Sequence, residues 1–325
     1  MIPSGPMSPA ARTVAGAGQR GWSAARRREA LQGWLWASPW ILGFFLFTFL
    51  PMVASLYLSF TTYTIGNWPA DWVGLANFKR ALSGADDLFW SSLRRTFQYA
   101  LLLVPLGLSG SLLAAVALNQ GLKGTTVFRT FFFLPSLTPI VASAVVWAWL
   151  YNPNWGLLNY LLAQIGIQGP RWLADPATAL PSLILVALWA AVGGNTMIIF
   201  LAGLQGVPKE MYEAAEIDGA GTIQRFFSIT VPMISPTLFF NLVIGVIAAL
   251  KVFATPLVMA NGGPNYATWT FILHLYQNAF QNYDMGYASA LAWVFMAIVV
   301  TLTAVNVRLS NRWVYYESQG RGDGD

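Results

Sequence analysis

The sequence predicts an all-α integral membrane protein with six transmembrane helices, on the evidence of its composition and its recurring apolar runs. Of its 325 residues, 56% are hydrophobic and 10% are charged, whereas a soluble domain carries about 25% charged residues. Most of the chain therefore cannot face water. Stretches of about 20 apolar residues are long enough to cross the hydrocarbon core of a bilayer, and such stretches alternate with short polar segments along the whole chain.

Six apolar stretches define the predicted spans. They cover residues 34–62, 96–118, 127–150, 180–204, 238–259 and 285–307. Trp34, Trp36 and Trp40 stand where the first span begins, as an interfacial aromatic belt would, and Pro51 within that span predicts a kink. The basic residues before this run are typical of a signal peptide, but no small-residue cleavage site follows, so we expect an uncleaved span.

Basic residues are distributed unevenly over this topology. Twelve are placed inside (Arg12, Arg20, Arg26, Arg27, Arg28, Lys123, Arg129, Lys209, Arg225, Arg308, Arg312 and Arg321) and five outside (Lys79, Arg80, Arg94, Arg95 and Arg171). This bias predicts cytoplasmic termini, and it explains the net charge of +5 without a nucleic-acid partner. The expected organisation is a flexible tail (1–33), a six-helix domain (34–310) with a cytoplasmic loop (205–235), and a second tail (311–325).

The loop between the fourth and fifth spans is the most informative segment. Pro208 suits the first position of a helix and Gly219 suits the position just past its end, so we expect one short helix between them. Pro208, Met211, Tyr212 and Ala215 share one face of that helix. The loop helix is therefore predicted to be amphipathic.

A second short helix, residues 222–229, is expected after the turn at Gly219. The pair Ser235–Pro236 then predicts the start of the fifth span, with Ser235 as N-cap and Pro236 at the first helical position. Two small helices are thus predicted to precede a membrane helix.

One pattern of spaced residues crosses both short helices. It consists of Glu213, Ala214, Ala215, Gly219, Ile229 and Pro232. In identity and spacing this pattern resembles the EAA loop of binding-protein-dependent ABC importer permeases, with Val231 replacing the usual leucine. The resemblance implies the type I ABC importer permease fold, with a cytoplasmic loop that docks on an ATP-hydrolysing subunit. The alternative, an amphipathic surface helix without a partner, does not account for the spacing.

A second set of segments resembles the carbohydrate-importer branch of these permeases, namely Lys251-Val252-Phe253, residues 261–264 and residues 286–290. Ala254 stands where that branch often has aspartate, so no role for that carboxylate is carried over. The resemblance implies a bacterial inner-membrane location, membrane lipid around the spans, and a sugar cargo. It also implies a second related permease, two copies of a cytoplasmic ATPase that bind ATP and Mg²⁺, and an external solute-binding protein. No cofactor is expected in this chain.

Four polar or aromatic residues are candidates for the substrate pathway: Lys251, Phe253, Asn241 and Asn195. Lys251 lies within a predicted span, so it either faces the pathway or extends to the interface. Polar residues such as Asn195 and Asn241 within spans more often serve as hydrogen-bond partners between helices than as ligands, so they are secondary candidates. Phe253 could stack on a sugar ring or simply pack.

Several other classes of function are disfavoured. The sequence contains no phosphate-binding G-x-x-x-x-G-K-[ST] loop, so ATP hydrolysis must come from another chain. A secondary carrier would need an ion-coupling site, and a membrane enzyme acting on lipid-linked sugars would need catalytic carboxylates or histidines. Neither signature is evident, cysteine is absent, and the single histidine, His274, has no metal-ligand neighbours in sequence. No catalytic or metal site is therefore predicted.

Overall fold

A computed structural model describes residues 24–67, 69–121 and 123–315, with side chains from residue 28 onward. Of the predicted tails (1–33 and 311–325), residues 1–23 and 316–325 lie outside the described residues. Contacts divide the chain into two units, residues 1–55 and 56–325. Within the described part the backbone is helical, and pairing of extended residues is limited to isolated bridges such as Thr61 with Trp72. The all-α prediction is confirmed.

The first unit is part of a helical run that begins well before Trp34. It comprises α1 (Ala24–Phe44), the π-helical turn Phe45–Phe49, and α2 (Leu50–Leu58). Pro51 has no N–H to donate, and the Leu50 N–H donates instead to the Phe45 carbonyl, five residues back. The proline predicted to kink this span is thus accommodated by a widened turn immediately before it.

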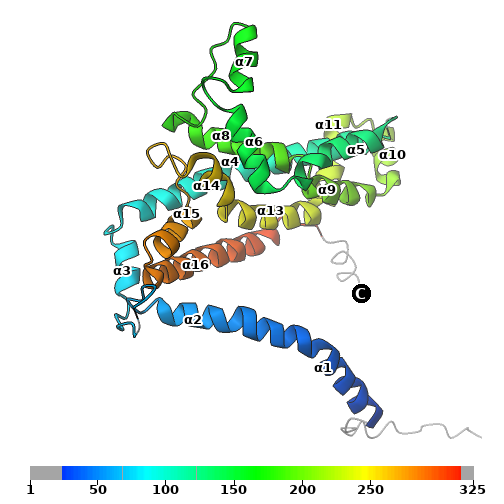
Figure 1. The fold of residues 1–325 in the computed structure, drawn as a ribbon. Coiled ribbons are helices and arrows are strands. Elements are labelled where there is room, and N and C mark those ends of the chain that lie inside the picture. The colour runs from blue at the N-terminus through cyan, green and yellow to red at the C-terminus, as the bar shows by residue number, and fades with distance from the viewer. Residues whose placement is uncertain (1–23, 68, 122, 316–325) are drawn as a thin grey trace, which may run out of the picture. The chain divides into compact units, whose positions relative to one another are not determined.

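The second unit contains the remaining helices (Figure 1). They are α3 (Ala76–Leu82), α4 (Asp87–Leu118), α5 (Thr125–Phe133), η2 (Leu134–Leu137), α6 (Ile140–Leu150), α7 (Leu157–Gln164), α8 (Pro176–Ala191), α9 (Asn195–Gln205), α10 (Lys209–Ile217), α11 (Thr222–Arg225), η3 (Phe226–Thr230), α12 (Val231–Met233), α13 (Ser235–Leu250), α14 (Ala254–Ala260), α15 (Phe271–Tyr276), η4 (Gln277–Gln281) and α16 (Met285–Ser310).

Three of the candidate spans are continuous helices and three are bent pairs. Residues 28–58, 87–118 and 285–310 are each long and apolar enough to cross a membrane, and the described residues give up to six spans if each bent pair counts as one. The pair of α5–η2 with α6 is bent by 95° and the pair of α8 with α9 by 46°. Pro135 and Pro139 explain the first bend because they lack N–H donors, and Gly193–Gly194 lie at the second.

Three predicted span boundaries are wrong. The first span was placed from Trp34, after a flexible tail of residues 1–33, but α1 already begins at Ala24. The second span was placed from Thr96, but α4 already begins at Asp87, whose preceding residue Asp86 caps it by accepting from the Leu88 N–H at 3.0 Å. The fifth span was placed up to Met259, but α13 ends at Leu250 and a separate helix begins at Ala254. Hydropathy did not reveal this break because the residues on both sides of it are apolar.

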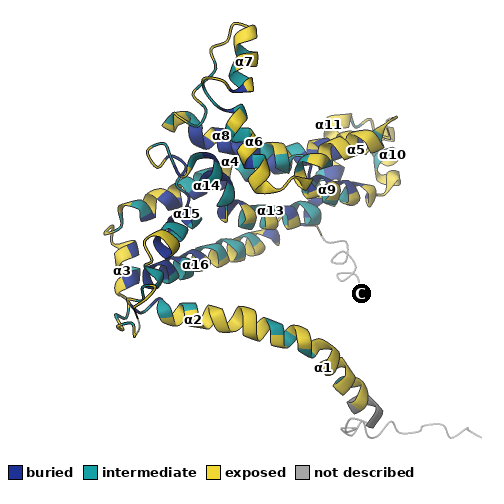
Figure 2. Ribbon diagram, in the orientation of Figure 1, coloured by how far each residue is buried: buried dark blue, intermediate teal, exposed yellow. Residues whose placement is uncertain are grey.

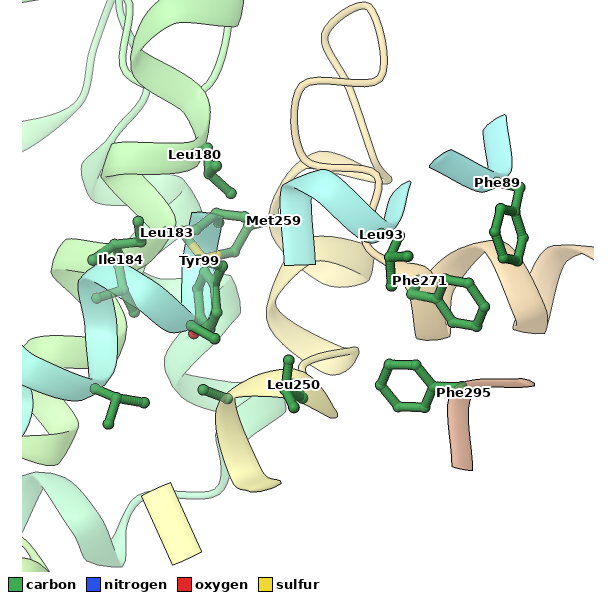
Figure 3. Packing of buried hydrophobic residues seen from close by; sticks show 14 of the residues in the cluster. Phe89, Leu93, Tyr99, Leu180, Leu183, Ile184, Leu250, Met259, Phe271 and Phe295 are labelled. Carbon is green, nitrogen blue, oxygen red and sulfur yellow. The ribbon is translucent and has the colours of Figure 1, made fainter. Parts of the chain in front are cut away.

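Helix α4 organises the core of the second unit by packing against α8, α9, α13 and α15. Small residues allow the close approach of α8, since the Ser111 hydroxyl reaches the Ala191 carbonyl at 3.0 Å. Aromatic rings fill the region near the start of α4, where Phe271 contacts both Phe89 and Phe295 with ring centroids 5.5 and 4.9 Å apart (Figure 3).

Candidate functional site

The short loop helix predicted between Pro208 and Gly219 is present as α10. Gly219 adopts a left-handed backbone with φ of 82°, a conformation that residues with a Cβ rarely adopt. The Gly219 N–H donates to the Glu216 carbonyl at 3.0 Å, and the Ala220 N–H donates to the Ala215 carbonyl at 2.9 Å. Gly219 therefore ends the helix as its sequence position predicted.

The predicted apolar face of α10 is only half correct. Tyr212 and Ala215 pack against a buried cluster that includes Ile229, and the Tyr212 hydroxyl lies 3.0 Å from the Thr230 hydroxyl. Pro208 and Met211, which were assigned to the same face, are instead exposed. Pro208 precedes the first helical residue and Met211 lies in the first turn, so the packed part of this face begins at Tyr212.

The outward side of the loop carries exposed residues of two kinds. Glu213 and Ala214 are exposed, as a docking surface requires. Large apolar side chains are exposed too: Ile217 is 87% exposed, Ile223 77% and Phe227 65%. These three residues were not predicted as part of the loop surface, although large apolar residues in a polar loop are a usable signal. Figure 2 shows α10 and α11 largely exposed.

The two short helices are joined by an ion pair, since Arg225 Nη1 lies 2.8 Å from Glu216 Oε2. The predicted second helix continues beyond Ile229, through η3 and α12 to Met233. Pro232 has no N–H, and the π-helical turn lies directly before it, as at Pro51. Chain direction then changes by 69° into α13.

Ser235 does not act as the predicted N-cap of the fifth span. Helix α13 begins at Ser235 itself, so Ile234 occupies the N-cap position, and no described side chain caps this end of the helix. The Ser235 hydroxyl instead accepts from the Tyr315 N–H at 2.8 Å. A contact 80 residues away in sequence has taken the place of the local one.

A cavity of about 680 Å³ lies among α4, α6, α8 and α13, and three of the four predicted pathway residues line it. They are Asn241, near the middle of α13, and Lys251 and Phe253, in the break after α13. Asn195 does not line it, although its neighbour Thr196 does. The structure thus brings Asn241, Lys251 and Phe253 together and leaves Asn195 exposed at the start of α9.

The chemistry of the lining favours a polar ligand. Asn241 is 5% exposed, and its side-chain N–H₂ group has no partner within the described residues. An unpaired buried donor costs roughly 1–3 kcal/mol. Irregular backbone at membrane depth is tolerated where it is buried in protein or faces a water-filled cavity, which fits the position of residues 251–253.

A buried polar cluster ties α4 to α15 and α16, and it includes the lone histidine. Asp86 Oδ2 lies 2.7 Å from His274 Nε2 and also accepts from the Tyr287 hydroxyl. Trp269 Nε1 donates to His274 Nδ1 at 3.3 Å, which leaves Nε2 as the nitrogen that donates to Asp86. His274 is therefore structural. Burial acts to raise the pKa of Asp86, but the hydrogen bonds that its carboxylate accepts from His274, Tyr287 and the Leu88 N–H hold that pKa well below its usual range.

Replacing Asp86 by asparagine should lower the free energy of unfolding by about 2–3 kcal/mol at pH 7, because a hydrogen-bonded carboxylate is lost. A carboxyl group whose pKa is lower in the folded than in the unfolded state stabilises the folded protein at pH values above its unfolded-state pKa, which is about 3.9 for aspartate. This stabilisation is lost as the pH falls towards the folded-state pKa. The gap in thermal midpoint between wild type and Asp86→Asn should therefore be constant from pH 7 to about 5 and shrink below that. A gap that stays unchanged down to pH 3 would contradict this role for Asp86.

Bent apolar spans around a cavity, joined to a helical loop with an exposed apolar surface, are the parts of a membrane permease. The model of the family described as "Binding-protein-dependent transport system inner membrane component" matches residues 105–315. The chain belongs to this family and is an inner-membrane permease component of an ABC transporter.

Individual relatives agree with this assignment. The chain is 44% identical over 297 residues to the probable ABC transporter permease protein YesP of Bacillus subtilis, covering 90% of this chain and 94% of that protein. It is 33% identical over 287 residues to the trehalose/maltose transport system permease protein MalF of Thermococcus litoralis, covering 88% and 96%. A solved bacterial alginate ABC transporter, in complex with an alginate pentasaccharide-bound periplasmic protein, has the same fold, with a TM-score of 0.78, 23% identity and coverage of 90% and 98%. The predicted importer permease fold is confirmed.

Proposed function

We propose that the chain is one of two related permease subunits in an ATP-driven importer, and that its cargo is a sugar or sugar-like solute delivered by an external solute-binding protein. The observation that carries the proposal is the continuity of loop and cavity. The loop residues Ile229 and Pro232 lead into α13, which carries Asn241 and ends next to Lys251. A displacement of the loop is thereby transmitted along one helix to the lining of the cavity.

The relatives support a sugar as the cargo. Their names refer to trehalose and maltose, to arabinooligosaccharides and to sulfoquinovosyl glycerol. The cavity suits such a solute, because the Asn241 amide can donate to a sugar oxygen and the Phe253 ring offers an apolar face. Asn195 remains a weaker candidate for a contact with the solute, because it lies outside the lining.

The exposed residues of the loop 205–235, called the coupling loop below, support the proposal that a separate ATPase supplies the energy. Ile217, Ile223 and Phe227 are large apolar side chains that an aqueous loop would not expose without a partner. Glu213, Ala214 and Gly219 lie on the same loop, and small residues such as Ala214 allow a close approach. In this proposal two ATPase copies bind ATP and Mg²⁺ on the cytoplasmic side of a bacterial inner membrane, with both termini of this chain on that side.

The assembled complex tests the proposal directly. The purified chain alone should hydrolyse no ATP above background, whereas the complex copurified with it should hydrolyse ATP faster when the loaded solute-binding protein is added. Vesicle uptake should require all components. Robust hydrolysis by the verified single chain, or uptake that persists without any ATPase, would contradict the proposal.

A further inference from the structure

The membrane cavity carries formal charge of one sign. Among the described residues that line it, Lys251 is the one basic residue, and no aspartate or glutamate shares the lining. Lys251 makes no ion pair with any described residue. Lys251 is exposed, so its ammonium group is accessible to a ligand in the cavity and is free to pair with an anion. The cavity therefore favours a ligand that brings a negative charge.

The rest of the lining suits a solute rich in hydroxyl groups. The Ser111 and Thr138 hydroxyls donate to backbone carbonyls, which leaves their oxygen lone pairs as acceptors. The buried Asn241 amide adds N–H donors that are unpaired within the described residues. The lining thus offers hydrogen-bond donors, acceptors and one cation, which are the groups that a charged sugar can bind.

A second hollow, of about 700 Å³, lies at the other end of α6, and it too combines a basic residue with polar and aromatic side chains. Helix α6 contributes Ser143 to the membrane cavity and ends near Trp149, which lines the hollow. The ring centroids of Trp149 and Trp155 are 5.8 Å apart. Arg171 lines the same hollow, no carboxylate among the described lining residues accompanies it, and it makes no ion pair with a described residue.

The wall of this hollow is held by the side chain of Asn159. Its Oδ1 accepts from Trp172 Nε1 at 2.7 Å, and its Nδ2 donates to the Pro153 and Pro170 carbonyls at 3.2 Å each. A side chain at Gly169 would collide with the Asn159 amide, so glycine is required there. These hydrogen bonds tie the segment before α7 to the segment after it, and Arg171, Trp149 and Trp155 all line the hollow between them.

We propose that the transported solute is an anionic saccharide, which contacts Arg171 in the hollow around α7 and then Lys251 in the membrane cavity. This inference rests on the proposed importer function and adds the substrate class. A planar guanidinium forms paired hydrogen bonds with a carboxylate, sulfonate or phosphate, while the indole rings cover the apolar face of a sugar. The ammonium of Lys251 then serves as a compact point charge for the same anion.

Uptake by the complete importer in membrane vesicles tests the substrate class. The probes are matched sets of labelled disaccharides, neutral, carboxylated, sulfonated and phosphorylated, supplied with the solute-binding protein, and the imported fraction is identified by mass spectrometry. We expect at least one anionic set to enter and its neutral counterparts to be excluded. Lys251→Met should lower the maximal uptake rate of the anionic solute by about tenfold, since tenfold corresponds to the loss of one charged contact. Lys251→Arg should retain most of the rate.

Two further variants separate the sites. Arg171→Gln should raise the half-saturating concentration of the loaded binding protein by several-fold and leave the maximal rate nearly unchanged. Lys79→Met removes the same charge from exposed α3, outside both linings, and should match wild type. Import of neutral saccharides alone, or equal uptake by Lys251→Met and wild type, would overturn the anionic assignment while leaving importer function intact. Exclusion of every saccharide set would overturn both.

Discussion

Replacing Gly193 by alanine should remove most of the folded permease from the membrane. Gly193 is buried in the bend between α8 and α9, and a Cβ built there would overlap the backbone carbonyl of Phe132. The clash is between the new Cβ and the main chain of Phe132, and a main chain cannot move aside as the end of a flexible side chain can. We expect a loss of more than about 3 kcal/mol in the free energy of unfolding. Size-exclusion chromatography of detergent extracts should show little monodisperse protein.

Gly107→Ala provides the matched control for this substitution. A Cβ at Gly107, in α4, would lie 3.6 Å from the Ala191 Cβ, which is ordinary van der Waals contact. That variant should keep wild-type yield, because alanine also favours the helix. If Gly193→Ala and Gly107→Ala behaved alike, the close passage of α5 over the bend would not be a requirement of the fold.

Replacing Gly219 by valine should uncouple ATP hydrolysis from transport. The left-handed backbone at Gly219 costs a β-branched residue about 1–3 kcal/mol, and no described atom lies within 4 Å of the added Cβ. The strain therefore acts on the ending of α10 rather than on the core. Membrane expression should persist, while uptake and the amount of copurified ATPase should both fall by about tenfold, the factor that roughly 1.4 kcal/mol gives.

Two variants calibrate this result. Gly221→Val places the same side chain two residues further on, where φ is −69° and no described atom is within 4 Å, so it should be milder. Glu213→Ala removes one exposed polar group and keeps helix propensity, so we expect a partial loss of transport. Wild-type uptake and wild-type ATPase recovery for Gly219→Val, at matched expression, would exclude a coupling role for the turn.

Much of the architecture could be predicted because hydropathy and turn chemistry are local properties. The last span was placed at residues 285–307, and α16 covers Met285–Ser310. Gly219 was correctly placed at the end of a helix from its position alone. The bends were not predicted, because a run of apolar residues looks the same whether it crosses the membrane straight or breaks at Gly193–Gly194.

The site was predictable only where the residue type was unusual for its surroundings. Lys251 and Asn241 stood out as polar groups within apolar runs, and both line the cavity. Asn195 met the same criterion but lies outside it, since the direction of a side chain depends on where α9 begins after the bend. The contact of Asp86 with His274 spans 188 residues and gives no local signal.

The meeting of the segment after α2 with the start of α16 constrains how the protein is made. The Gly286 N–H donates to the Tyr63 carbonyl at 2.9 Å, and the Ile65 N–H donates to the Tyr283 carbonyl at 3.3 Å. Asp86 needs Tyr287 to complete its hydrogen bonds. During translation, Tyr63 and Asp86 leave the ribosome long before residues 283–287 are synthesised. Until the final helix inserts, the Tyr63 carbonyl and the Ile65 N–H lack these partners and the Asp86 carboxylate is incompletely paired, so this end of the bundle closes last during biosynthesis.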